Sequence, residues 1–153
     1  MLEVKRLHIG YSKALFEEPI SGHWKKGAVV ILLGDNGVGK STFLKTLAEL
    51  IDPIAGEVHL NSESIGWVDS SISKGVYLSV HDFLSFGINS LLEEKKEWLE
   101  KFDLTIQLDR FLDELSDGQF RKLCIIRQLL KKPEILFLDE PTVYLDVKSK
   151  SRL

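Results

Sequence analysis

The stretch Gly34-Asp35-Asn36-Gly37-Val38-Gly39-Lys40-Ser41-Thr42 decides which fold this chain is predicted to adopt. It matches the pattern of a glycine, any four residues, and then Gly-Lys-Ser/Thr. The apolar run 28–33 precedes it and is rich in β-branched residues, which is typical of a buried parallel strand. Apolar residues from Phe43 to Ile51 follow at the spacing of one helix face. The pattern therefore predicts a strand, a glycine-rich turn and a helix.

The chemistry of this turn points to phosphate binding. Successive backbone N–H groups of residues 34–42 would face a concavity at the positive end of the helix. The glycines let the main chain approach phosphate groups without a Cβ in the way. Lys40 would supply a positive charge to the β- and γ-phosphates, and the hydroxyl group of Ser41 would be a ligand for Mg²⁺. We predict a nucleoside triphosphate site here, because the strand and helix on either side disfavour the alternative of a chance glycine loop.

Composition narrows the classes of protein that this chain can be. A length of 153 residues with 44% hydrophobic residues suits one domain with a single core. The net charge of −3 gives no electrostatic reason to expect nucleic acid as a partner. Cys124 is the only cysteine, which excludes an internal disulfide and a multi-cysteine metal site. The sequence has neither a long apolar stretch nor a signal-peptide pattern, so we expect a cytoplasmic protein that reaches a membrane only through a partner.

The first part of the chain is predicted to form a small antiparallel sheet. Strand-like segments occur at 2–9, around 14–16 and at 20–24, with turns between them. Tyr11 lies in the first of these turns and could stack on an adenine ring. A tyrosine packed on the sheet is an equally acceptable interpretation of the same residue.

The rest of the chain alternates short strands with longer helical stretches. Strands are predicted at 57–60 and 65–68, and a polar loop follows at 69–76. Ser79 to Asp82 is typical of a capping box that opens a helix, and Ser116 or Asp117 can cap a later one.

A second apolar run, 135–138, is also predicted to be a buried parallel strand. It is followed directly by Asp139 and Glu140. Ligands of open α/β sheets gather at the C-terminal ends of the strands. We therefore expect these two carboxylates to lie beside the phosphates bound by the first loop.

Three motifs occur in a characteristic order: GDNGVGKST at 34–42, LSDGQ at 115–119 and ILFLDEP at 135–141. In this order they resemble the Walker A, signature and Walker B motifs of the ATP-binding cassette (ABC) ATPases, the motor subunits of ABC transporters. The similarity covers nearly the whole chain. It implies an α/β P-loop NTPase fold, in one domain over 1–153, with a mostly parallel core sheet. It also implies a small N-terminal antiparallel β subdomain and an inserted α-helical lobe at about 79–130.

The resemblance also implies a role for each motif. Asp139 and Ser41 would hold Mg²⁺, and Glu140 would orient or deprotonate the water that attacks the γ-phosphate. Lys40 would act with Glu140 in catalysis. The residues expected to bind ATP are Gly34, Asp35, Asn36, Gly37, Val38, Gly39, Lys40, Ser41, Thr42, Tyr11, Ser116, Gly118 and Gln119.

The partners follow from the same resemblance. Two nucleotide-binding domains, as a homodimer or a heterodimer, would pair head to tail with two ATP molecules between them. The Ser116 helix of one subunit would contact the γ-phosphate bound by the other. Transmembrane permease subunits would dock on the loop 69–76 and the start of the lobe, so the chain would be peripheral on the cytoplasmic face of the membrane.

The sequence departs from the family pattern at two places. The family's Q-loop glutamine follows the strand at 65–68, whereas this chain has Asp69-Ser70-Ser71, and Asp69 could stand in for the glutamine. The family's switch histidine follows the D-loop, which corresponds to 143–146 here. None of the chain's histidines, His8, His23, His59 and His81, lies in that region, so we expect this H-loop portion to be absent.

These departures leave two main hypotheses about function. The first is an ATPase subunit of an ABC transporter. The second is an ATP-dependent dimerisation or binding module with weak hydrolysis or none. A soluble family member acting in translation or DNA repair ranks last, because those proteins usually carry two cassettes or large insertions.

Overall fold

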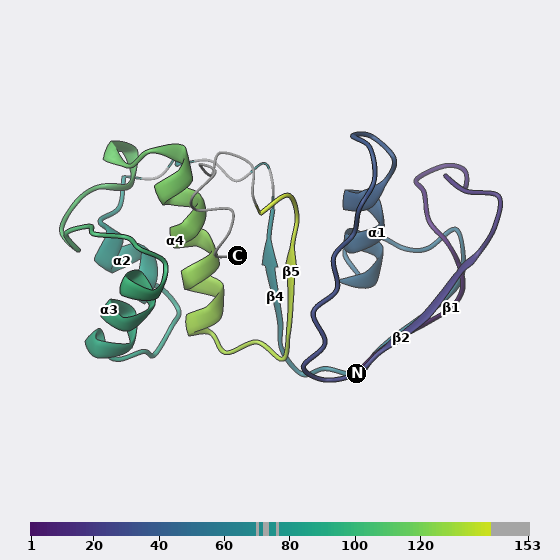
Figure 1. Ribbon diagram of the computed structural model, residues 1–153, viewed down its shortest axis with the longest axis horizontal. Helices are drawn as coiled ribbons and strands as arrows, with labels where there is room; N and C mark the ends of the chain where they lie inside the picture. The colour runs from purple at the N-terminus through teal and green to yellow at the C-terminus, as the bar shows by residue number, and fades with distance from the viewer. Residues whose placement is uncertain (70, 72–73, 76, 142–153) are drawn as a thin grey trace. The chain divides into compact units, whose positions relative to one another are not determined.

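The computed structural model describes residues 1–69, 71, 74–75 and 77–141, and Figure 1 shows the course of the chain. It forms two compact units, Met1–Ile65 and Gly66–Leu153, each with its own elements. None of the helices in the described ranges has both the length and the apolar character that a bilayer-spanning helix needs.

The first unit contains a three-stranded antiparallel sheet. Its strands are β1 (Leu2–His8), β2 (Ile20–Trp24) and β3 (Ala55–Leu60), in the order β2-β1-β3. Residues 2, 4 and 7 of the central strand are buried, as expected for a sheet with one face turned to a core. This sheet confirms the predicted N-terminal antiparallel subdomain.

The segment around 14–16 is not a strand, contrary to the prediction. It makes one isolated bridge, between Gly10 and Ala14, and the amide of Leu15 donates to the carbonyl oxygen of Ile9 at 2.8 Å. The chain therefore folds back on the end of β1 in a tight turn. A turn this short uses its hydrogen bonds locally, which leaves none for a ladder with a second strand.

The apolar run 28–33 is not a strand either, and this is the largest error of the sequence-based prediction. Neither of the two sheets formed by the described residues includes it. The side chains of Val29 and Leu33 are each 89% exposed. A β-branched apolar run favours an extended, buried strand, but it becomes one only where neighbouring strands satisfy its backbone groups.

Helix α1 (Lys40–Leu47) follows the glycine-rich loop, as predicted. Phe43, Thr46 and Leu47 are its buried residues. The helix ends before the apolar pattern does, because Glu49 adopts the left-handed region with φ of 56°.

The second unit contains a two-stranded sheet of β4 (Ile65–Val68) and β5 (Ile135–Leu138), both at the predicted positions. The two strands run in the same direction (Figure 1). The amide of Asp139 donates to the carbonyl oxygen of Val68 at 3.0 Å, which continues the pairing just past the end of β5. The two C-terminal strand ends therefore lie side by side.

Four helical elements complete the described part of the second unit. They are α2 (Val80–Ser85), α3 (Leu92–Lys101), the 3₁₀ helix η1 (Leu112–Glu114) and α4 (Asp117–Leu130). In Figure 1, α4 lies between the sheet on one side and α2 and α3 on the other. Its apolar residues contribute to both contacts, and they belong to one buried cluster with Val68, Leu84 and Leu99. Both predicted N-caps are present, since Ser79 accepts from the amide of Asp82 and Ser116 from that of Gln119.

Candidate functional site

The glycine-rich loop leads directly into the N-terminus of α1. Gly39 is the N-cap residue, with φ of 105°, and Gly37 has φ of 81°. A Cβ on Gly39 would also lie 2.7 Å from Cδ1 of Leu15, so a side chain has no room there. No side chain caps the start of α1. A helix N-terminus without a side-chain cap offers its N–H groups to an external acceptor, and anions are the acceptors that its dipole favours.

The ammonium group of Lys40 lies against the loop that precedes it. Its Nζ donates to the carbonyl oxygens of Gly34 and Asp35, at 2.8 Å each. The first turn of α1 carries no acidic residue. The positive charge is therefore held at the loop, where the motif requires it for phosphate binding.

Tyr11 lies in the turn after β1 and is 72% exposed. Its neighbours Ile9, Leu15 and Phe16 are the side chains nearest to a Cβ built on Gly39. The turn that carries Tyr11 therefore flanks the start of α1. An exposed ring beside the loop suits adenine stacking, which stays a prediction.

The signature residues form the N-terminus of α4. The hydroxyl oxygen of Ser116 accepts from the amide of Gln119 at 3.2 Å, and the side-chain oxygen of Gln119 accepts from the amide of Ser116 at 2.9 Å. This reciprocal pair is a capping box. Ser116 is exposed and Gly118 is the second residue of the same helix, so the motif is placed at the tip of a helix.

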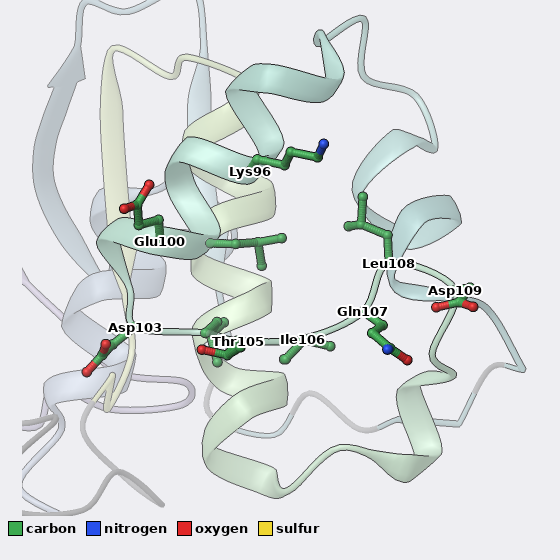
Figure 2. Close-up of a pocket in the computed structure, with 10 residues that line it drawn as sticks. Lys96, Glu100, Asp103, Thr105, Ile106, Gln107, Leu108 and Asp109 are labelled. Atoms are coloured by element: carbon green, nitrogen blue, oxygen red, sulfur yellow. The ribbon is translucent and has the colours of Figure 1, made fainter.

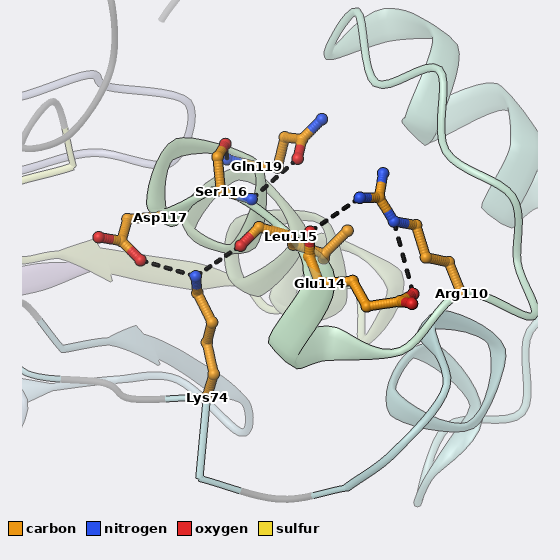
Figure 3. Close-up of polar contacts among 7 residues, drawn as sticks. All are labelled: Lys74, Arg110, Glu114, Leu115, Ser116, Asp117 and Gln119. Carbon is orange, nitrogen blue, oxygen red and sulfur yellow. Dashed lines mark hydrogen bonds and ion pairs between the residues drawn. The ribbon is translucent and has the colours of Figure 1, made fainter.

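Two basic side chains hold the backbone that leads into α4, as Figure 3 shows. Lys74 donates to the carbonyl oxygen of Leu115 at 2.6 Å and pairs with the carboxylate of Asp117 at 2.7 Å. Arg110 donates to the carbonyl oxygen of Glu114 at 2.8 Å. Lys74 thus offsets the negative charge that Asp117 brings to the signature motif. Sequence reasoning missed this pair, since a lysine in a polar loop gives no signal of its partner.

The Walker B carboxylates follow β5. Asp139 is buried, with 2% exposure, whereas Glu140 is exposed. Glu140 adopts the left-handed region, with φ of 47°. Non-glycine residues in that region cost free energy and cluster at functional sites. The two carboxylates therefore differ in environment.

Arg121 is the functional candidate that sequence reasoning overlooked. It lies in the second turn of α4 and is only 4% exposed. Its guanidinium group donates to the carbonyl oxygens of Asp69 and Asp139, and to that of Glu140 at 3.3 Å. The available signal was an arginine next to Phe120 in the apolar stripe of a helix. Such a charge is rarely buried without a defined set of partners.

Asp69, the residue considered as a stand-in for the Q-loop glutamine, makes a local turn. One carboxylate oxygen accepts from both the amide and the hydroxyl group of Ser71, at 2.8 and 2.6 Å. The other accepts from the indole N–H of Trp67 at 3.4 Å. Its role at a metal ion stays a prediction.

Cys124 and the groove beside α3 lie outside the motifs. Burial raises the pKa of the Cys124 thiol to about 12, so it stays protonated at neutral pH and is a poor nucleophile. A groove of about 690 Å³ runs between α3 and the segment 103–109 (Figure 2). Its lining includes Leu99, Glu100 and Ile106, and no residue of the three motifs.

The structure brings the predicted residues together within each unit. In the unit Met1–Ile65, the loop 34–42 and the turn with Tyr11 adjoin the start of α1. In the unit Gly66–Leu153, Arg121 joins the signature helix to the end of β5. The expectation that Asp139 and Glu140 face phosphates bound by the loop stays a prediction.

Comparisons with known proteins agree with the motifs. The sequence profile of the ABC transporter family matches residues 18–143. An ABC transporter ATP-binding protein of Methanocaldococcus jannaschii is 31% identical, over 100% of this chain and 61% of its own length. The iron(3+)-hydroxamate import ATP-binding protein of Bacillus subtilis is 32% identical, over 95% of this chain and 63% of its own length. The chain thus spans less than two thirds of the length of both relatives.

Solved structures show the same similarity. An ABC transporter ATP-binding protein from Pyrococcus furiosus superposes with a TM-score of 0.91 at 32% identity, covering 99% of this chain and 80% of the other. The cbiO1 subunit from Clostridium perfringens, part of a transporter complex, superposes with a TM-score of 0.77 at 29% identity, covering 98% of this chain and 69% of the other. The predicted P-loop NTPase fold is therefore confirmed, and the chain belongs to the ABC transporter family of ATP-binding proteins.

Proposed function

We propose that this chain binds Mg²⁺ and ATP and hydrolyses the ATP as the nucleotide-binding part of an ABC transporter. The observation that carries the proposal is the start of α1, where Lys40 lies against a glycine-rich loop at a helix end without a side-chain cap. A positive charge held beside the backbone N–H groups of a helix N-terminus is what a triphosphate requires. The membership of the family supports ATP as the nucleotide.

The residues divide the work of hydrolysis between them. Lys40 and the loop amides would bind the terminal phosphates and offset the charge that develops as the γ-phosphoryl group transfers. The Ser41 hydroxyl and the buried Asp139 carboxylate would be oxygen ligands for Mg²⁺. The described residues contain no cluster of three or more His, Cys, Asp or Glu side chains suited to a metal. Mg²⁺ usually takes only one or two carboxylate ligands from a protein, so the Asp139 carboxylate suits it.

Glu140 is the proposed general base. Its side chain is exposed, and its backbone is held in an unusual conformation just past the buried Asp139. A carboxylate can orient an attacking water and accept its proton when the two lie within hydrogen-bond reach. Removing the negative charge while keeping the shape of the side chain should therefore slow the chemical step more than it weakens binding.

The proposed partners are a facing nucleotide-binding domain and transmembrane permease subunits. Ser116 is exposed at the tip of α4, where the helix dipole favours an anion. In a head-to-tail pair that tip would contact the γ-phosphate of ATP bound by the facing subunit. Loss of that phosphate on hydrolysis would release the pair, a switch driven by γ-phosphate contacts. The chain would then act on the cytoplasmic face of the membrane.

The function is tested by measuring ATP affinity and phosphate release with purified protein and Mg²⁺. We expect turnover by the wild-type chain and a loss of about 100-fold or more in Glu140→Gln, with ATP affinity retained. Glu134→Gln is the matched control, because Glu134 precedes β5 while Glu140 follows it. Tight binding without turnover in the wild type would instead assign the alternative function, an ATP-dependent dimerisation module.

A further inference from the structure

We propose that Arg121 is a positioning residue that sets the direction of the Glu140 side chain, an inference that rests on the proposed ATPase function. Arg121 acts through the backbone carbonyl groups to which its guanidinium group donates.

The two contacts at the end of β5 lie on either side of one Cα atom. The carbonyl group of Asp139 belongs to the peptide plane that precedes the Cα of Glu140, and the carbonyl group of Glu140 belongs to the plane that follows it. Nη2 of Arg121 donates to both of these oxygens. Because each peptide unit is rigid, holding both planes fixes φ and ψ of Glu140. Those two angles determine where its Cβ points.

The conformation held in this way is one that Glu140 would not adopt by itself. Its φ of 47° lies in the left-handed region, which the surrounding structure must stabilise in a residue with a side chain. Without Arg121, the peptide planes could turn toward a more common backbone conformation. The carboxylate would then point elsewhere, although the amide of Asp139 would keep its hydrogen bond to the carbonyl oxygen of Val68.

The third contact joins the neighbouring strand to the same guanidinium group. Nη1 donates to the carbonyl oxygen of Asp69, which directly follows β4. Three carbonyl oxygens from two adjacent strand ends therefore converge on one planar group. Arginine suits this task because its donors are fixed in a fork, whereas lysine offers one compact ammonium group.

Stability alone gives a poor reason for an arginine at this position. The Nε atom of Arg121 is buried and has no hydrogen-bond partner among the described residues. A buried unpaired donor is unfavourable, and well-packed apolar side chains often replace buried charges without loss of stability. An arginine that pays this penalty is better explained by the geometry that it imposes on its partners.

Arg121 also connects Glu140 to the signature motif. Ser116 and Arg121 lie at the same end of α4: Ser116 is its N-cap, and Arg121 lies in its second turn. A displacement of this helix end would carry the guanidinium group with it and turn the peptide planes of Glu140. The direction of the general base would thus depend on the position of α4.

The test compares Arg121→Met and Arg121→Lys with the matched control Arg127→Met. Arg127 lies on the same helix and also donates to carbonyl oxygens, those of Phe83 at 2.9 Å and Phe86 at 3.1 Å. It therefore holds helix α2 rather than the end of β5. Each variant is examined for kcat and KM with ATP, and by hydrogen exchange of peptides covering 66–69 and 137–141.

We expect Arg121→Met to lower kcat by roughly 10- to 100-fold, the range for a misplaced catalytic group, with KM changed by less than about threefold. Exchange at 137–141 should be at least about tenfold faster than in the wild type, while the α3 peptides stay unchanged. Arg121→Lys should restore part of kcat. Arg127→Met should leave kcat and the 137–141 exchange within about twofold of the wild type.

Wild-type kcat in Arg121→Met, or unchanged exchange at 137–141, would overturn the proposal. If circular dichroism shows that Arg121→Met does not fold, kcat and hydrogen exchange at 137–141 are measured in Arg121→Lys instead. Wild-type values of either in that variant would then overturn the proposal. If the wild type binds ATP without turnover, the proposed ATPase function fails, and the exchange comparison still accepts or rejects Arg121 as the residue that fixes the backbone of Glu140.

Discussion

Lys40 shows how a single side chain can be prepared for a ligand by its own loop. Its ammonium group is held by the carbonyl oxygens of Gly34 and Asp35. These contacts bring a positive charge to the concave loop before any phosphate arrives. The conformational entropy of this long, flexible side chain is then lost mainly on folding, so less is lost when the ligand binds.

Lys40→Ala should therefore weaken ATP binding strongly. Charge-assisted hydrogen bonds are each worth about 1.5–3 kcal/mol, so we expect a loss of roughly 10- to 150-fold or more in affinity. Lys45→Ala, which changes a lysine in the last turn of the same helix, is the control and should keep wild-type affinity. Isothermal titration calorimetry measures both, and equal affinities in the two variants would contradict the assignment of the site.

The sequence pattern identified the two acidic residues after β5, but it did not identify the arginine that holds their backbone. Asp139 and Glu140 were recognisable because they follow an apolar run and match a known motif. Arg121 was not, because its partners are backbone oxygens of Asp69, Asp139 and Glu140. Carbonyl groups are common to all residues, so no side-chain pattern reveals which of them an arginine will meet.

At the scale of elements, α2 is a helix whose start is determined locally. It has only six residues, and Ser79 satisfies the amide of Asp82 at 3.0 Å. The Ser79 hydroxyl also donates to the carboxylate of Asp82 at 2.7 Å. That hydrogen bond lowers the pKa of Asp82. A lowered carboxyl pKa contributes stability at neutral pH, and the contribution is lost as the pH falls through that pKa.

Ser79→Ala should lower the free energy of unfolding by about 1 kcal/mol, the usual cost of losing an N-cap. Urea denaturation at pH 7 measures the loss. Ser79→Thr keeps the hydroxyl acceptor and should recover most of the stability. An alanine variant as stable as the wild type would mean that the N-cap of α2 contributes nothing.

The run 28–33 shows the opposite case, an element that local pattern predicts and the structure does not form. Its residues are apolar and β-branched, yet Val29 and Leu33 are exposed and neither described sheet includes them. The run 135–138 is also entirely apolar and does form a strand, β5, because β4 lies beside it. The two runs differ in whether another strand lies beside them, and the number of apolar residues in a run does not predict this.

At the scale of the whole molecule, the signature tip of α4 is predicted to act on a second subunit. Ser116→Arg should block ATP-dependent dimerisation, because a long charged side chain would fill the space meant for the facing γ-phosphate. Binding of ATP by the monomer should be unchanged, since the loop 34–42 is not altered. Light scattering with and without ATP measures the first effect, and calorimetry the second.

Two controls separate the loss of a cap from the added bulk. Ser116→Ala removes the hydroxyl group and the cap of α4 without adding volume, and should weaken dimerisation less than Ser116→Arg does. Thr105→Arg adds the same side chain at an exposed position beside the α3 groove (Figure 2) and should dimerise as well. If Ser116→Arg dimerises at the same ATP concentration as the wild type, the signature tip makes no contact across subunits.

Features that depend on residues close together in the chain were predictable from the amino-acid pattern. These are the glycine loop with its positive-φ turn, the caps at Ser79 and Ser116, and the motif order that places the chain in its family. Three other features became visible only in the folded chain: β4 is the partner of β5, Lys74 offsets Asp117, and Arg121 holds the backbone around Glu140. The physical reason is range: caps and turns are satisfied within a few residues, whereas strand pairs and buried charges take partners that are distant in sequence and become neighbours only on folding.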